Sequence, residues 1–154
     1  EPVRAYCGGG AGDGDAVRGS RWRECGAAVA EPGGTEKLPI YERAERLVAV
    51  ELVPVIAHPE RSLGPRADFG IARALVEHGC LLCPNGDSAL GANGPLVEQA
   101  FWRLVDEGLV ALVASDGHSR QRPPRLDHAH RVLVERYGEA SEVLFDGSAM
   151  PWIC

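Results

Sequence analysis

Short apolar runs alternate with stretches of helical periodicity along most of this chain, and that alternation constrains the fold more than any other feature. The apolar runs are short and several are rich in β-branched residues, which is typical of buried strands. Between them, apolar residues recur three and four positions apart, which is typical of amphipathic helices. The pattern predicts strands at residues 27–31, 53–57, 80–83 and 109–114, and helices at residues 41–52, 65–78, 95–107, 124–137 and 139–145.

Four strands that are each followed by a helix predict an α/β fold with a parallel sheet. Such βα units are joined by right-handed crossovers, so all the strands end at the same edge of the sheet. Polar residues that follow different strands can therefore converge on one site. The residues at or just after the predicted strand ends are Glu31, His58, Asn85, Asp116 and His118.

The composition is that of one globular domain. The chain has 154 residues, of which 45% are hydrophobic and 25% charged, enough to bury a core. Its net charge of -6 gives no support to nucleic-acid binding, and no apolar run is long enough to span a membrane. An odd count of five cysteines at irregular spacing favours a reducing, cytoplasmic setting. We expect a glycine-rich, irregular segment at residues 1–25 and a folded domain at residues 26–154. Because the first residue is Glu1, we also expect a fragment.

Histidine and acidic side chains at the strand ends suggest a metal site. His58 follows the second predicted strand, and Asp116 and His118 follow the fourth. With Glu31 they form a mixed nitrogen and oxygen ligand set, which suits manganese, iron or zinc. A carboxylate can also bridge two metal ions, as in many phosphatases. The alternative is that His58 and Asp116 only cap a strand and a turn.

Two arginines near these ligands are candidates for phosphate binding. Arg61 lies in the loop after the second predicted strand, where its guanidinium could bind two phosphate oxygens. The alternative is a surface ion pair with Glu60 or Asp68. Arg122 follows the other ligand loop and could make a second phosphate contact, a role for which Arg120 competes.

The other histidines and the paired cysteines have simpler interpretations. His128 and His130 lie two apart on a predicted helix, so they point in different directions and cannot share a metal; both are predicted to face solvent. His78 is expected to interact with the carboxyl end of its helix. Cys80 and Cys83 are expected to be buried thiols in a strand. No motif of serine-triad hydrolases, P-loop enzymes or dinucleotide-binding proteins is present.

Taken together, these motifs resemble those of the PHP-domain phosphoesterases. Within that group they are most similar to the manganese-dependent protein-tyrosine phosphatases of bacterial capsule and exopolysaccharide operons. The resemblance covers about residues 27–150. It rests on PVIAHPER at 54–61, LVEHGCLL at 75–82, SALG at 88–91, GLVALVASDGH at 108–118 and RPP at 122–124.

The resemblance implies a fold, a cofactor and a substrate. The fold is a distorted, TIM-barrel-like β/α barrel, of which four βα units are visible here. The cofactor is Mn²⁺ or another divalent metal such as iron or zinc, with more than one ion in the complete domain. The implied metal ligands are Glu31, His58, Asp116 and His118, and the implied phosphate ligands are Arg61 and Arg122. The implied substrate is a phosphotyrosine protein, a bacterial tyrosine autokinase of polysaccharide biosynthesis.

One part of the family pattern has no counterpart here. Family members begin with a strand that carries an H-x-H ligand pair, whereas residues 1–25 contain no histidine. The resemblance therefore predicts an N-terminally truncated or a degenerate member. Two alternatives stay open: a PHP-type enzyme acting on a small phosphate ester such as histidinol phosphate, and an inactive remnant that binds phosphate or a partner. Assembly into a homo-oligomer is also left open.

Overall fold

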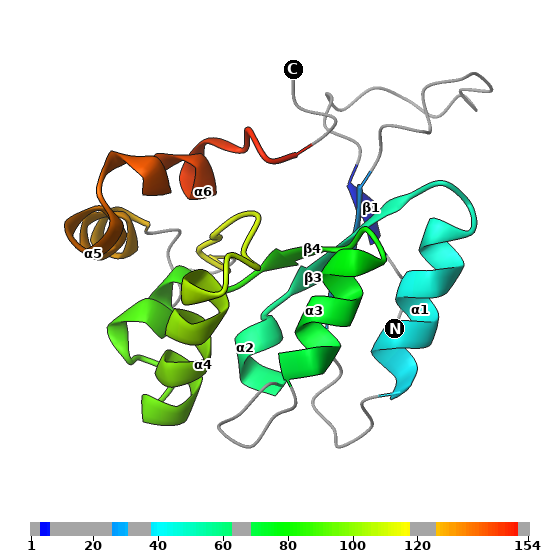
Figure 1. Ribbon diagram of the computed structural model, residues 1–154, viewed down its shortest axis with the longest axis horizontal. Helices are drawn as coiled ribbons and strands as arrows, with labels where there is room; N and C mark the ends of the chain where they lie inside the picture. Colours follow the sequence, from blue (N-terminus) through cyan, green and yellow to red (C-terminus); the bar gives the residue numbers. More distant parts are fainter. Residues whose placement is uncertain (1–3, 7–25, 31–37, 63–68, 118–125, 151–154) are drawn as a thin grey trace.

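The strands form one sheet in the order β1-β2-β3-β4 (Figure 1). Three of them, β2 (Gly26–Ala30), β3 (Val53–Ala57) and β4 (Leu81–Cys83), are parallel neighbours, with Val55 of β3 opposite Ala28 of β2. These positions agree with the prediction, and the parallel arrangement is confirmed. The computed structural model describes residues 4–6, 26–30, 38–62, 69–117 and 126–150.

The strand β1 (Arg4–Tyr6) was not predicted. It pairs antiparallel with β2, with Arg4 opposite Ala28, inside the segment that was expected to be irregular. Three residues are too few to show a period in the sequence. The strand forms because the edge of β2 offers unpaired backbone groups to a passing segment.

The fourth predicted strand is wrong as a continuous strand. Its residues make two isolated parallel bridges to the chain at and after β4, at Val110 and Ala114. Pro84 has no N–H to donate to a ladder between them. The N–H of Val113 turns away and donates to the carbonyl of Leu144 at 2.8 Å. The segment still runs beside β4, so its end still lies at the same edge of the sheet.

The longer helices agree with the predicted ones, with small shifts at their ends. They are α1 (Leu38–Val48), α3 (Phe69–Glu77), α4 (Pro95–Asp106) and α5 (Asp127–Tyr137). α1 starts earlier than predicted, at Leu38, and it ends earlier because a turn follows it, in which Glu51 has a left-handed backbone with φ of 60°. No helix in the described part of the chain is long and apolar enough to cross a membrane.

Two short helices follow strand ends and were not predicted. α2 (Pro59–Ser62) comes after β3, and the 3-10 helix η2 (Gly86–Leu90) comes after β4. Each is too short to produce a helical period in the sequence. Near the C-terminus, η3 (Glu139–Glu142) and α6 (Val143–Asp146) together replace the single helix predicted at residues 139–145.

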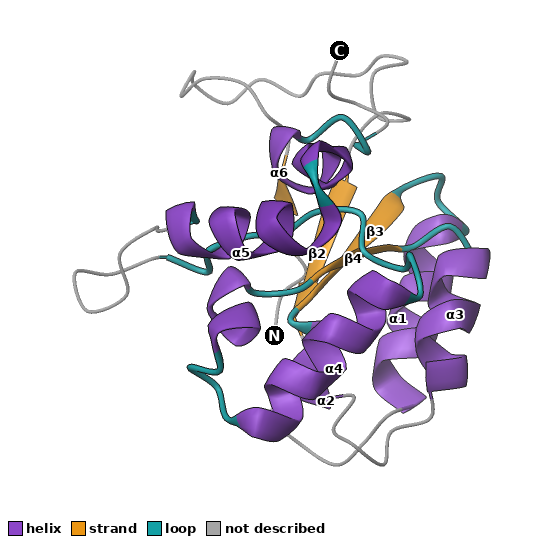
Figure 2. Cartoon of the chain, turned by 60° about the vertical axis from the view of Figure 1, so that its left-hand side comes forward, coloured by secondary structure: helices purple, strands orange, loops and turns teal. Residues whose placement is uncertain are grey.

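The main core lies where helices pack against one face of the sheet. Figures 1 and 2 show α1 and α3 side by side on this face. The buried side chains of this core are Ile40, Ala44, Ile56, Phe69, Ala72, Leu75, Cys80, Leu82, Ala100 and Leu104. A smaller cluster joins η2, α4 and α5 and contains Ala89, Phe101, Val113 and Leu133.

Two apolar residues at the ends of the longer helices are exposed. Val48 is 41% exposed and Leu96 is 53% exposed. Val48 is the last residue of α1 and Leu96 is the second residue of α4. The apolar period continues to the helix ends, where no other described element covers these two side chains.

Candidate active site

The structure describes half of the residues predicted to form the site. His58, Arg61 and Asp116 lie in the described part of the chain. His58 and Arg61 follow the end of β3, and Asp116 follows the isolated bridge at Ala114. Outside the described residues lie Glu31, His118 and Arg122, whose roles stay predictions.

The end of β3 presents His58 and Arg61 on one tight turn. The N–H of His58 donates to the carbonyl of Cys83 at 3.1 Å, which anchors the turn to the neighbouring strand β4. Pro59 then occupies the first position of α2, where its missing N–H has no cost. The N–H of Arg61 donates to the carbonyl of His58 at 3.1 Å and closes the turn.

The carboxyl group of Asp116 contacts both of these residues. Its Oδ1 lies 3.3 Å from Nε2 of His58, and its Oδ2 lies 3.4 Å from Nη2 of Arg61. The side chains are between 20% and 33% exposed, so they are partly shielded from water and still accessible to a ligand. The alternative in which Arg61 pairs with Glu60 is wrong, because Glu60 is buried and bonded elsewhere. Asp68, the other partner considered, lies outside the described residues.

The backbone at both candidate ligands is left-handed. His58 has φ of 54° and Asp116 has φ of 50°, a region that side chains other than glycine rarely adopt. Such strain costs on the order of 1–3 kcal/mol per residue and is concentrated at functional sites. Local backbone preferences alone would not place two residues that contact each other in this rare conformation. The strain therefore supports a functional role for the pair.

A buried hydrogen-bond network around Glu60 anchors the turn that carries His58 and Arg61. This network was not predicted from the sequence. Glu60 is fully buried, and its Oε1 accepts from Ser88 Oγ at 2.8 Å and from the N–H of Asn85 at 3.1 Å. Asn93 Nδ2 donates to Ser88 Oγ at 3.0 Å. Two signals could have found it: an acid between His58 and Arg61, and a serine within the SALG motif.

The geometry of His58 and Asp116 fits a shared divalent metal. Two ligand atoms bound at about 2.0–2.2 Å to one ion, with an angle near 90–110°, lie about 3.0–3.5 Å apart. The observed 3.3 Å between Nε2 of His58 and Oδ1 of Asp116 falls in that range. The described residues hold no group of three or more such ligands. The other two predicted ligands, Glu31 and His118, lie outside them.

Most of the chain matches one known protein family. Residues 32–149 match the family described as "Capsular polysaccharide synthesis, CpsB/CapC". The chain belongs to this family. The matched range includes the His58–Arg61 turn, Asp116 and the Glu60 network, whereas Glu31 lies one residue before it. The predicted relationship to proteins of bacterial capsule operons is confirmed.

Curated CpsB/CapC relatives share part of their length with this chain. The tyrosine-protein phosphatase YwqE of Bacillus subtilis (strain 168) is 34% identical over 87 residues, covering 56% of this chain and 34% of YwqE. CapC of Staphylococcus aureus is 28% identical over 118 residues, covering 73% of this chain and 46% of CapC. The chain thus spans less than half the length of these relatives.

A solved CpsB/CapC-type structure has the same fold in the matched region. It belongs to a set described as YwqE from Bacillus subtilis and CpsB from Streptococcus pneumoniae, unique metal-dependent tyrosine phosphatases. Its TM-score is 0.62 at 28% identity, over 77% of this chain and 51% of that chain. The α/β class is therefore shown, with a small, mainly parallel sheet in the described residues. The predicted barrel is not shown by them.

The cysteines of this CpsB/CapC member are structural in the described region. Cys80 and Cys83 are buried free thiols, as predicted. Burial raises the pKa of Cys80 to about 11 and that of Cys83 to about 12, and the nearby Glu60 and Asp116 add to the shift at Cys83. A thiol with so high a pKa is a poor nucleophile at neutral pH.

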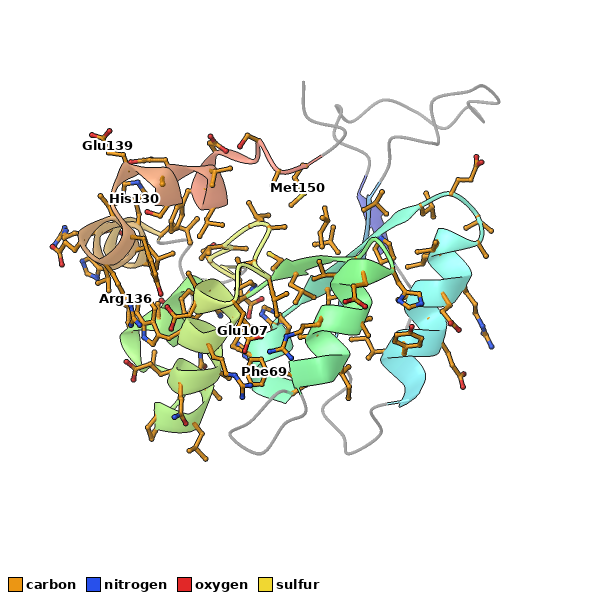
Figure 3. All side chains as sticks on the ribbon, viewed as in Figure 1. Phe69, Glu107, His130, Arg136, Glu139 and Met150 are labelled. Carbon is orange, nitrogen blue, oxygen red and sulfur yellow. The ribbon has the colours of Figure 1, made fainter. Side chains whose placement is uncertain are left out.

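Of the remaining histidines, one departs from its prediction. His128 is solvent-facing, but His130 packs edge-on against Phe145 and its Nε2 lies 3.0 Å from Oε2 of Glu142 (Figure 3). It helps hold α5 against η3 and α6. His78 lies at the carboxyl end of α3 as predicted, with Nδ1 2.7 Å from the carbonyl of Ala74.

Proposed function

We propose that this chain is part of a metal-dependent phosphotyrosine phosphatase, in which residues 26–154 contribute to a PHP-type distorted β/α barrel. The contact of Asp116 with both His58 and Arg61 carries the proposal. It joins two candidate metal ligands to a cation suited to phosphate. The names of the relatives, tyrosine-protein phosphatases and metal-dependent tyrosine phosphatases, support the same reaction.

The residues that would hold metal are His58 and Asp116, together with Glu31 and His118. We propose Mn²⁺, or alternatively iron or zinc, with more than one ion in the complete domain. When bound, such ions lower the pKa of a coordinated water and neutralise negative charge on phosphate. His58 would supply an imidazole nitrogen and Asp116 a carboxylate oxygen, a ligand pair that suits these metals. The hydrogen-bonded turn at His58 and the left-handed backbone at Asp116 would fix the positions of both donors before binding.

Arg61 would bind the phosphate of the substrate, and Arg122 would provide a second contact. Nη2 of Arg61 lies 3.4 Å from Oδ2 of Asp116, which is long for a charge-assisted hydrogen bond. A phosphate group offers the same cation two oxygens in matching geometry. Arg61 would keep its position beside the metal ligands and stabilise the charge on the phosphoryl oxygens during transfer.

We infer that the substrate is phosphotyrosine on a protein, a bacterial tyrosine autokinase of polysaccharide biosynthesis. The family description, capsular polysaccharide synthesis, supports this setting. The odd number of cysteines at irregular spacing supports a cytoplasmic location for the reaction.

The test is hydrolysis of a phosphotyrosine peptide in the presence of Mn²⁺. We expect Arg61→Ala to lower kcat/KM by about 100-fold or more, because it removes a charged contact to the phosphate. Arg73→Ala is the matched control: it removes an arginine that pairs with Glu107 at 2.8 Å, so kcat/KM should stay near the wild-type value. A chelator should abolish the reaction.

Three results would contradict the proposal. Chelator-resistant hydrolysis would exclude the metal. Efficient release of phosphate from histidinol phosphate, without release from the peptide, would assign a small-molecule substrate. Phosphate binding without any turnover, in this chain and in a version extended upstream, would identify a non-catalytic protein.

A further inference from the structure

Glu60 connects the two halves of the candidate site through hydrogen bonds. It follows His58 by two residues and precedes Arg61, yet its side chain points into the protein and is fully buried. Its Oε1 accepts from the N–H of Asn85 at 3.1 Å and from Ser88 Oγ at 2.8 Å. The turn that presents His58 and Arg61 is therefore fastened to the start of η2.

The start of η2 is fastened in turn to the segment that carries Asp116. The N–H of Gly86 donates to the carbonyl of Ala114 at 2.8 Å, and Asn85 forms a parallel bridge with Ala114. Glycine at position 86 permits this close approach, because a Cβ there would lie only 3.0 Å from Ala129 Cβ on α5 and its neighbours would have to shift. A continuous path thus runs from Glu60 through Asn85 and Gly86 to Ala114, two residues before Asp116.

The state of the second carboxyl oxygen argues for more than a packing role. Oε2 of Glu60 is buried and has no hydrogen-bond partner among the described residues. A buried carboxyl group with one unpaired oxygen stabilises the folded protein less than an apolar side chain of similar size at the same position. Residues with such a cost are expected where function requires them.

We propose that Glu60 is the positioning residue of the site: its carboxyl group sets the separation of His58 and Arg61 from Asp116. This inference rests on the proposed function only where it names metal and phosphate as the ligands of the site. The positioning itself is a property of the folded chain. It would act on metal binding through His58 and on phosphate binding through Arg61.

Hydrogen exchange of the backbone amides tests the positioning directly. In Glu60→Ala we expect the amides of His58, of residues 60–62 and of residues 85–88 to exchange at least about tenfold faster, because both hydrogen bonds to Oε1 are lost. Ser88→Ala removes one of the two and should speed exchange about threefold to tenfold. Glu60→Gln keeps an acceptor oxygen at Oε1 and should stay within about threefold of wild type.

The control is a second carboxylate that joins two elements. Glu107 bridges Arg73 of α3 and Arg103 of α4, at 2.8 and 2.9 Å, and lies near Phe69 (Figure 3). Glu107→Ala therefore destabilises the helix packing without touching the Glu60 network. It should leave exchange at the amides of His58 and of residues 60–62 unchanged relative to the rest of the chain.

Titration with Mn²⁺ gives the second readout. We expect Glu60→Ala to raise the Kd for Mn²⁺ about tenfold or more, as loss of a residue that orients metal ligands does. Glu60→Gln should have a Kd close to that of wild type, and Glu107→Ala should leave the Kd near wild type.

Equal effects of Glu60→Ala and Glu107→Ala on both readouts would overturn the proposal. If Glu60→Ala does not fold, unchanged exchange in Ser88→Ala would overturn it. Exchange needs neither metal nor substrate, so this result is independent of whether phosphotyrosine is hydrolysed.

Discussion

At the scale of single residues, the site is built from conformations that most side chains avoid. Of the three described non-glycine residues with positive φ, two are His58 and Asp116. Their side chains meet at 3.3 Å, so the strained positions are also the ones in contact. A left-handed residue changes the direction of the chain at each of the two positions, next to this contact. A sequence pattern reports that a histidine ends a strand, but it does not report this change of direction.

The strain at Asp116 can be measured by removing its side chain in two ways. Asp116→Gly and Asp116→Ala both delete the carboxyl group, but only glycine adopts φ of 50° without a steric cost. We expect the glycine variant to be more stable by about 1 kcal/mol in urea unfolding. At the neighbouring Ser115, whose φ is not positive, the order should reverse. An alanine variant at Asp116 as stable as the glycine variant would contradict the left-handed backbone.

The buried thiols predict a loss of stability at alkaline pH. In the unfolded chain a thiol ionises near its ordinary pKa of 9.0, whereas folding raises the pKa of Cys80 to about 11 and that of Cys83 to about 12. The neutral thiols therefore contribute stability in full below pH 9, and this contribution is lost as the pH rises toward 11 and 12. A double variant, Cys80→Ala with Cys83→Ala, should show a smaller decrease in unfolding free energy between pH 9 and 11. Parallel profiles would show that these thiols ionise equally in both states.

At the scale of elements, the sequence predicted what depends on periodicity and missed what depends on tertiary contacts. The strand β3 and the start of α4 at Pro95 lie where they were predicted, because a β-branched run and a helix-starting proline are local signals. α2 and η2 were missed because each is shorter than two turns of helix. Their positions come from hydrogen bonds such as Asn85 N–H to Glu60, which join residues distant in sequence.

The helix α4 provides a test of which apolar residues form the core. Leu104 is completely buried, whereas Leu96 on the same helix is 53% exposed. We expect Leu104→Ala to lower the unfolding free energy by about 2–5 kcal/mol, because it leaves a cavity. Leu96→Ala should change it by no more than about 0.5 kcal/mol. Similar losses from the two substitutions would contradict the packing of α4.

At the scale of the whole molecule, parallel strands bring ligands from separate parts of the chain to one sheet edge. The prediction that His58 and Asp116 converge required only that all strands end at the same edge, and it is confirmed by their contact. The prediction holds although the fourth predicted strand is not continuous, because two bridges are enough to align residues 110–114 with β4 and the residues after it. The sequence shows an acid between His58 and Arg61, but it does not show that this side chain is buried and bonded to Asn85 and Ser88, because that depends on tertiary packing.

We propose that His58 and Asp116 hold a divalent metal in this chain. It is tested most directly by titrating the protein with Mn²⁺ and measuring free Mn²⁺ by electron paramagnetic resonance. We predict saturable binding to the wild-type chain and a Kd at least about tenfold higher for Asp116→Asn, which loses a charged ligand. The variant Arg73→Ala, altered outside the site, should bind as wild type does. Equal affinity of wild type and Asp116→Asn for Mn²⁺ would contradict the account.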